Sequence, residues 1–181
     1  MAHERSGIKA AVEAAGGELE LMNPAKYLEV EIPQGQDLKK WYFYSPVLDA
    51  DVLINVPIAK HHSLAGLTLG MKNLMGVILD RSSIHSNLGQ RLADLSSLLR
   101  PELTVVDAVR ILVANGPSGG SLNDVRKMDT VIACHDIVAA DTYAATLFGK
   151  QPSDLEYIGA GARMGLGEMD LGKLKIEEIP S

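Results

Sequence analysis

Three segments of the chain carry apolar side chains at the spacing of an amphipathic helix. The first stripe is formed by Ile8, Val12 and Ala15, and it stops at a Gly-Gly pair, 16–17. Asp136 precedes the last stripe and is a favourable N-cap. We therefore predict helices over 8–15, over 88–99 and after Asp136. The two longer stripes consist of Leu88, Leu92, Leu95 and Leu99, and of Ile137, Ala144, Leu147 and Phe148.

Short apolar runs rich in β-branched residues lie between these stripes. The runs DVLINVP (51–57), LTVVD (103–107) and TVIAC (130–134) are typical of strands that are buried on both faces. Two further short strands are expected at ELELM (18–22) and YLEVEI (27–32). The alternation of strands and helices predicts a single α/β domain over 1–181, Rossmann-like and three-layered, with a mostly parallel sheet and helices on both faces.

Polar residues follow the three main strands. The first is followed by Lys60, His61 and His62, the second closes with Asp107, and the third leads to His135 and Asp136. If the three strands are parallel, these groups share one carboxyl edge, which is where open α/β sheets bind ligands. Each of them taken alone is more simply explained as a turn or cap residue.

The segment GLTLGMKNLMGVI (66–78) has two sides when drawn as a helix. Its apolar stripe contains Leu67, Met71 and Ile78, whereas Lys72 and Asn73 face the other way. Its three glycines indicate either a close approach of a neighbouring element or an irregular backbone. An ordinary solvated face would explain Lys72 and Asn73 about as well as a ligand role.

Asp141 lies on the apolar stripe of the helix predicted after Asp136. A buried carboxylate needs hydrogen-bond donors, because desolvating an unpaired charge is costly. We predict that Asp141 is buried and hydrogen-bonded, and we favour a structural cap over a contact to the site.

Composition narrows the range of partners. The chain has 181 residues, 46% hydrophobic, with a formal charge of -6 and no basic run longer than a pair, which argues against a nucleic-acid surface. No signal peptide or membrane-length apolar run is present, so we expect no membrane partner and a cytoplasmic location. Cys134 is the single cysteine, and the chain cannot ligate a common iron-sulfur cluster by itself.

The candidate chemistry is that of an anion pocket. Lys60 and Lys72 supply positive charge, Asn73 and the backbone amides around Gly119 supply donors, and the helix behind Asp136 presents its N-terminus. A phosphate or carboxylate small molecule would suit such a pocket. The alternative takes His61, His85 and Asp107 as a metal-binding set, although their spacing matches no compact metal motif.

The segment 51–78, followed by His85, LTVVDAV, NGPSGG, HDIVAADTYAA and GARMGLGE, resembles the prokaryotic family catalogued as domain of unknown function 362. The resemblance runs from about Asp51 to Gly167, and its specific part is the Lys-His pair followed by Lys-Asn-Leu-x-Gly. Members often carry a ferredoxin-like domain and have no settled activity. The family usually opens with a strand ending in Lys-Pro-Asn, and this chain is expected to lack that strand.

Two functions remain open. The chain is expected to be the substrate-binding part of a redox-linked enzyme, with His61 or His85 as proton donor, or a noncatalytic module that docks a separate iron-sulfur protein. In the second case the aromatic segment KWYFYSP (40–46) is the candidate contact surface. Both functions require either a separate ferredoxin-like partner or the missing amino-terminal segment. Any cofactor remains unassigned.

Overall fold

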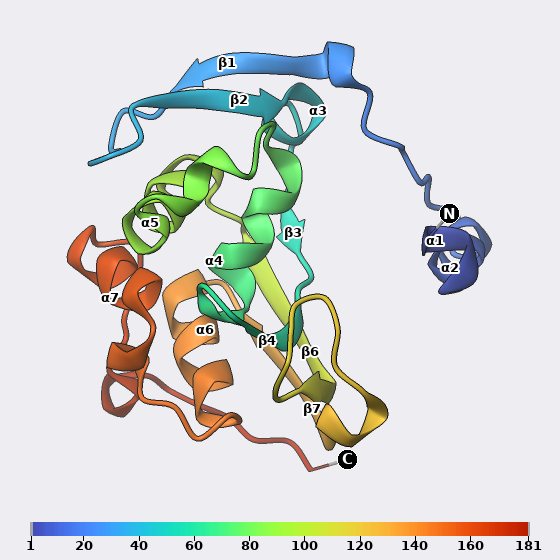
Figure 1. Ribbon diagram of the computed structural model, residues 1–181, viewed down its shortest axis with the longest axis vertical. Coiled ribbons are helices and arrows are strands. Elements are labelled where there is room, and N and C mark those ends of the chain that lie inside the picture. Colours follow the sequence, from blue (N-terminus) through green and yellow to red (C-terminus); the bar gives the residue numbers. More distant parts are fainter. Residues whose placement is uncertain (1, 181) are drawn as a thin grey trace.

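The computed structural model describes the fold of residues 2–180. A five-stranded sheet forms its centre (Figure 1). Its hydrogen-bonded strands follow the order β3, β6, β4 and β5, and β7 also pairs with β6. The strands are β3 (Ile54–Asn55), β4 (Ile58–His62), β5 (Gly66–Thr68), β6 (Leu103–Leu112) and β7 (Val125–Cys134).

Strand directions in this sheet are mixed. β6 runs parallel to β3 and β4 and antiparallel to β7, and β5 is antiparallel to β4. The prediction that the third run, TVIAC, is parallel to the other two is therefore wrong. Only a three-residue 3₁₀ turn, η4 (Leu122–Asp124), lies between β6 and β7, and a parallel return would need a long crossover. The two strands instead extend to ten residues each and pair directly.

Four helices pack on one side of the sheet: α4 (Gly70–Asn73), α5 (Leu88–Leu99), α6 (Ile137–Thr146) and α7 (Glu156–Arg163) (Figure 1). α6 contacts both β6 and β7, and α5 packs against α7. The core between them contains Leu67, Met71, Leu92, Leu95, Val106, Ile111, Val138 and Ile158. The predicted α/β class, with a central sheet flanked by helices, is confirmed, as are the helices at 88–99 and after Asp136. The four packed helices lie on one side of the sheet, whereas the sequence predicted helices on both faces.

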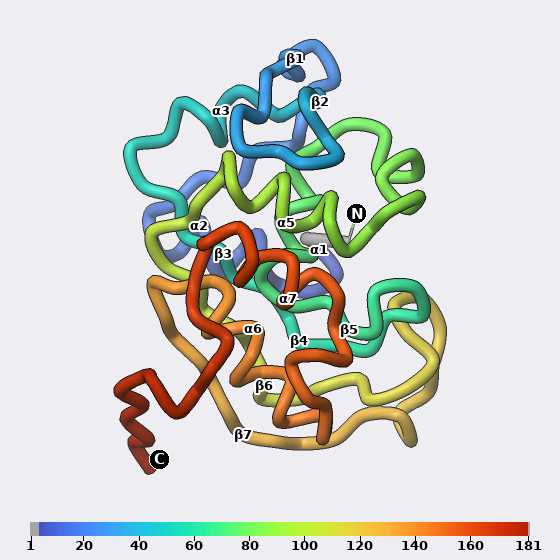
Figure 2. The backbone as a smooth tube through the Cα atoms, turned by 90° about the vertical axis from the view of Figure 1, so that its left-hand side faces the viewer, coloured from blue at the N-terminus to red at the C-terminus, as the bar shows by residue number. Residues whose placement is uncertain are grey.

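The amino-terminal third forms separate pieces. α1 (Ala2–Arg5) and α2 (Ile8–Ala14) are followed by an extended segment, the hairpin β1 (Tyr27–Glu31) and β2 (Lys40–Tyr44), and α3 (Ser45–Leu48). The helix at 8–15 and the strand at 27–32 agree with prediction, whereas 18–22 forms no strand. Figure 2 shows the hairpin at one end of the molecule and the carboxyl-terminal segment at the other.

The hairpin buries two of its five aromatic side chains and partly buries two more. Phe43 and Tyr44 are buried, and the Trp41 indole N–H donates to the carbonyl of Leu79 at 2.7 Å. Tyr42 is the aromatic residue of this strand with a largely exposed side chain. The aromatic segment therefore serves mainly to fix the hairpin on the core, and little of it forms a contact surface.

The segment 66–78 divides into β5, α4 and a 3₁₀ turn instead of one helix. Leu69 is extended, so the backbone leaves β5 before α4 begins. The predicted apolar stripe is nonetheless buried throughout. The 3₁₀ turns of the chain are η1 (Pro24–Lys26), η2 (Leu74–Val77), η3 (Ser83–His85), η4 (Leu122–Asp124), η5 (Pro152–Asp154) and η6 (Leu171–Lys173).

Candidate functional site

The end of β4 carries the first group of polar side chains. Lys60 and His61 are half-buried strand residues that pair with Thr68 and Leu67 of β5. Lys60 is also opposite Leu112, at the carboxyl end of β6. The two parallel strands therefore bring these residues to the edge of the sheet that the sequence predicted for them.

His61 is fixed by the loop that follows β6. The Gly116 N–H donates to His61 Nδ1 at 3.1 Å, and the Ser63 N–H donates to the Gly116 carbonyl at 3.2 Å. A side chain at position 116 would meet the His61 carbonyl oxygen at 2.3 Å, so only glycine allows this approach. Because a backbone N–H only donates, neutral His61 carries its own proton on Nε2.

His62 is oriented in the same way and is more deeply buried. Its Nδ1 accepts the N–H groups of Leu64 at 3.1 Å and Ala65 at 3.2 Å, so its Nε2 also carries the proton. Burial, acting first, and the nearby positive charges of Lys72, His85, His61 and Lys60 together lower the pKa of His62 to about 4. The imidazole is therefore neutral at pH 7 and presents an N–H donor.

Lys72 lies on α4 with a half-buried side chain. Burial lowers the pKa of Lys72, and so do the nearby charges of Arg81 and Lys60. Within residues 2–180, no ion pair connects an acidic side chain to either Lys60 or Lys72. The charges that act on Lys72 are thus cationic, which is unfavourable unless an anion joins them.

α4 is positioned by buried polar contacts. The Gly70 and Met71 N–H groups donate to the two carboxylate oxygens of Asp141, at 2.6 and 2.9 Å. Asn55 donates to the Gly70 carbonyl at 3.0 Å and accepts from Asn73 Nδ2 at 2.9 Å. Asp141 is the buried structural cap that the helical wheel predicts. Asn73 holds α4 to β3, and its amide nitrogen is thereby already engaged.

The segment after η2 adds Arg81 and His85. Arg81 donates to the Gly76 carbonyl at 2.6 Å, which holds it beside α4. His85 Nδ1 lies 3.0 Å from the Ser82 carbonyl, and a carbonyl only accepts, so Nδ1 carries the proton. Neutral His85 therefore leaves Nε2 as an acceptor, the reverse of His61 and His62.

We call Lys60, His61, His62, Lys72, Arg81 and His85 the basic cluster. We group them because the charges of Lys72, His85, His61 and Lys60 act on the pKa of His62, and those of Arg81 and Lys60 act on the pKa of Lys72. Four of the six were candidates from the sequence. His62 was recognised at the strand end but not assigned a role, and Arg81 gave no signal, since its place beside Lys72 depends on the fold of η2.

Three predicted site residues have other roles. Asp107 lies within β6, not at its end, and its carboxylate accepts the Val109 N–H at 3.0 Å. Asp136 caps α6 through the Ala139 N–H and also accepts the Glu168 N–H at 2.8 Å. Because β7 is antiparallel, its end at Cys134 pairs with Thr104, which places Asp136 at the opposite edge from Lys60. Gly119 has a positive φ of 118° in the loop after β6, where a side chain would meet the Asn115 carbonyl oxygen at 3.3 Å.

The histidines and acidic residues do not converge as metal ligands. In the portion of the chain that the structure describes, no three His, Cys, Asp or Glu side chains are grouped closely enough to hold a metal ion. The alternative set of His61, His85 and Asp107 thus gains no support from the geometry.

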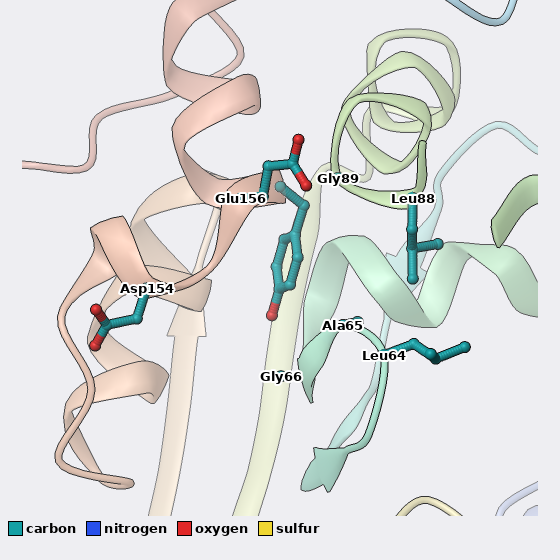
Figure 3. Close-up of a pocket in the computed structure, with 8 residues that line it drawn as sticks. Leu64, Ala65, Gly66, Leu88, Gly89, Asp154 and Glu156 are labelled. Atoms are coloured by element: carbon teal, nitrogen blue, oxygen red, sulfur yellow. The ribbon is translucent and has the colours of Figure 1, made fainter. Parts of the chain in front are cut away.

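A cavity of about 240 Å³ adjoins the turn after His62 (Figure 3). Its walls come from the turn 64–66, from the start of α5 and from η5–α7. Asp154 and Glu156 contribute carboxylates to this wall, and a side chain at Gly89 would collide with Glu156. These carboxylates make the cavity unsuitable for an anion, so it is distinct in chemistry from the basic cluster.

The low pKa of His62 predicts a specific acid sensitivity. The unfolded chain protonates this residue near pH 6.5, whereas the folded chain resists protonation down to about pH 4. Stability is therefore lost as pH falls through this window, by about 2 kcal/mol between pH 6.5 and 5. Urea unfolding of the parent and of His62→Gln at both pH values isolates the effect, because the variant lacks this contribution. An NMR titration that places the His62 pKa near 6.5 would contradict the buried, neutral ring.

Comparison with known proteins places the chain in a family without assigning a reaction. A family model described as "Domain of unknown function (DUF362)" matches residues 1–146. A thylakoid-associated protein of Synechocystis sp. is 27% identical over 128 residues, which cover 66% of this chain and 39% of that protein. The chain thus spans less than half the length of this curated relative. No solved structure matches the chain.

Among residues 2–180, no helix combines the length and apolar character that crossing a bilayer requires.

Proposed function

We propose a function for this chain, which belongs to the DUF362 family of domains of unknown function, from the chemistry of its basic cluster. The cluster binds a small anion, a phosphate or a carboxylate. The observation that carries this proposal is Lys72, a half-buried lysine whose pKa is lowered by burial, Arg81 and Lys60. Among the described residues, Lys72 has the cations Arg81 and Lys60 nearby, and no carboxylate forms an ion pair with it.

An anion relieves the unfavourable energy of this arrangement. Ordinarily a half-buried lysine is paired with a carboxylate, because burying an ammonium without a counter-charge is costly. A bound anion supplies that counter-charge and interacts strongly with Lys72, since the apolar neighbours Met71 and Leu74 exclude water. Charge-assisted hydrogen bonds from an ammonium are also stronger than neutral ones.

The histidines add directional donors. His61 and His62 each use Nδ1 as an acceptor of backbone N–H groups, so both carry an N–H on Nε2. Such donors suit phosphate or carboxylate oxygens. His85 differs, because its neutral form has a free lone pair on Nε2. In a substrate-binding part of a redox-linked enzyme, His61 is suited to donate a proton and His85 to accept one.

The test compares anion binding by the parent protein with that by a variant in which both lysine charges of the cluster are removed. Replacing Lys60 and Lys72 together by methionine keeps the aliphatic length of the side chains but removes two ammonium donors. Each charged hydrogen bond contributes about 1.5–3 kcal/mol, so affinity for inorganic phosphate or citrate should fall at least about 100-fold. Isothermal titration calorimetry measures the affinity, and circular dichroism checks the fold.

A matched control removes two lysines elsewhere. Lys127 and Lys173 are exposed and paired with acidic neighbours, so a Lys127→Met, Lys173→Met variant changes net charge equally. It should bind the anions as the parent does at physiological salt, where distant surface charges are screened. Equal weakening in both double variants, or unchanged binding in the Lys60, Lys72 variant, would reject the basic cluster as the site.

Electron transfer, if it occurs, requires a separate ferredoxin-like protein, because Cys134 is the single cysteine of the chain. The noncatalytic docking module is the second candidate function, and Tyr42 is the exposed residue of its aromatic segment.

We propose a cytoplasmic location. The Synechocystis relative is thylakoid-associated, which suggests attachment to a membrane surface as the alternative, and fractionation of the native host's cells would detect it.

A further inference from the structure

One face of the central sheet is left without packed helices. Side chains alternate along β6, so Val106 and Ala108 are buried under α6 while Asp107 and Val109 point to the other side. In β7 the exposed Val131 likewise lies between the partly buried Thr130 and Ile132. We call this side the outer face, and its exposed apolar residues are Ile54, Val56, Ile58, Val109 and Val131.

The exposed apolar residues of the outer face lie next to one another and form a continuous patch. Ile54, Val56, Ile58 and Val131 are 54%, 59%, 52% and 61% exposed, and they come from neighbouring segments of one sheet. Four β-branched residues half-exposed together amount to an apolar patch on the order of 300–400 Å², the size that usually marks an interaction site. Covering it would release water from each of these side chains.

The same chain contains a helix that lacks a packing surface. α2 carries Ile8 and Val12 one turn apart, yet none of its residues is buried, and Ile8 is 50% exposed. A helix of seven residues is too short to be stable in water without tertiary packing. Figure 1 shows α1 and α2 on the outer side of the sheet, apart from its strands.

The tether between α2 and the body of the protein is short. Glu20 is held to the hairpin by an ion pair with Lys26 and by a hydrogen bond from the Tyr44 hydroxyl at 2.7 Å. Gly16, at the end of the helix, has a φ of 81°, a conformation that glycine adopts freely and that allows the helix to change direction. α2 is therefore confined near the outer face by a few residues.

We propose that the outer face is the docking surface for α2 of the same chain, which lays Ile8 and Val12 against Ile58, Val109 and Val131. Lys9 flanks the apolar stripe and lies 3.9 Å from Glu13 on the same helix, so α2 brings no net charge to a face that carries Asp107. The short tether gives the helix a high effective concentration at its own sheet, which a second copy of the chain lacks at ordinary protein concentrations.

Cysteine crosslinking tests the docked position. In a Cys134→Ala background, Val12→Cys is combined with Val131→Cys and treated with a short bismaleimide at low protein concentration. The expected product is a crosslink within one chain, identified by mass spectrometry after proteolysis. The control pairs Val12→Cys with Leu122→Cys, a residue that is 89% exposed in the loop between β6 and β7, outside the outer face, and should yield little intrachain product.

Crosslinks that form only between chains would show that a second copy covers the outer face, and an absence of Val12–Val131 crosslinks would show that α2 does not cover it. Either result overturns the proposal. A second measurement does not depend on added cysteines: Val12→Asp should release α2 and increase fluorescence of the apolar dye ANS severalfold, while circular dichroism shows that the sheet and the remaining helices persist. Unchanged ANS binding in Val12→Asp would also overturn it.

Discussion

Replacing Asp94 by alanine is expected to lower the free energy of unfolding by about 3–5 kcal/mol, because the change removes a buried carboxylate that accepts four hydrogen bonds. Asp94 lies on α5 and is fully buried. Its carboxylate accepts the backbone N–H groups of Gln36, Asp37 and Leu38 at 2.9, 2.9 and 2.7 Å. The side-chain amide of Gln90 adds a fourth donor at 2.9 Å.

These bonds attach the β1–β2 hairpin to the helical layer. The loop between the two strands has no other acceptor for the three N–H groups, so it would detach or draw water into the core. Leu38 is buried beside them and would lose its packing as well. The loss is therefore expected to exceed that of a single hydrogen bond.

Urea unfolding of Asp94→Ala, Asp94→Asn and Asp51→Ala measures the effect. Asp94→Asn keeps one acceptor oxygen, but turns an N–H₂ group toward at least one donor, so an intermediate loss is expected. Asp51 is exposed, and its replacement should change stability by less than about 0.5 kcal/mol. A loss below about 1 kcal/mol in Asp94→Ala would show that the hairpin does not depend on these bonds.

Replacing Asp141 by alanine is expected to have the second-largest effect, about 3 kcal/mol or more. Asp141 accepts the first two N–H groups of α4, and both donors are buried. Burial raises the pKa of Asp141 and the two N–H donors lower it, with a net value of about 7, so the side chain contributes most when both oxygens accept. Gly70 packs so closely that a side chain there would meet Asp141 Oδ1 at 2.7 Å.

The consequence reaches the basic cluster, because Lys72 lies within α4. Asp141→Ala should weaken phosphate binding in addition to lowering stability, whereas Asp94→Ala should affect stability alone. Thermal unfolding and calorimetry on the same samples separate the two outcomes, and Asp141→Asn, which retains one acceptor, should fall between parent and alanine in both. Full anion affinity in a folded Asp141→Ala variant would show that α4 keeps Lys72 in place without this cap.

Local patterns in the sequence located most of the elements. The helices around Val12, Leu92 and Ile137 were predicted from 3.6-residue periodicity, which reports one buried face and depends only on near neighbours. The same periodicity identified Asp141 as buried, because a polar residue on an apolar stripe is visible without knowing its partner. The segment 18–22 was misread as a strand, since alternating side chains do not form a strand without a neighbour to pair with.

The sequence by itself determined which residues are apolar on one side and where positive charge is concentrated, at Lys60 and Lys72. Strand direction was decided only by tertiary structure, because β7 pairs with β6 through contacts that no local pattern records. Because β7 is antiparallel, Asp136 lies at the opposite edge of the sheet from Lys60. The turn after α4 places Arg81 near Lys72. Side-chain alternation and periodicity act over a few residues, whereas the partners of a buried carboxylate or a cation can lie 71 positions away, as Gly70 and Asp141 do.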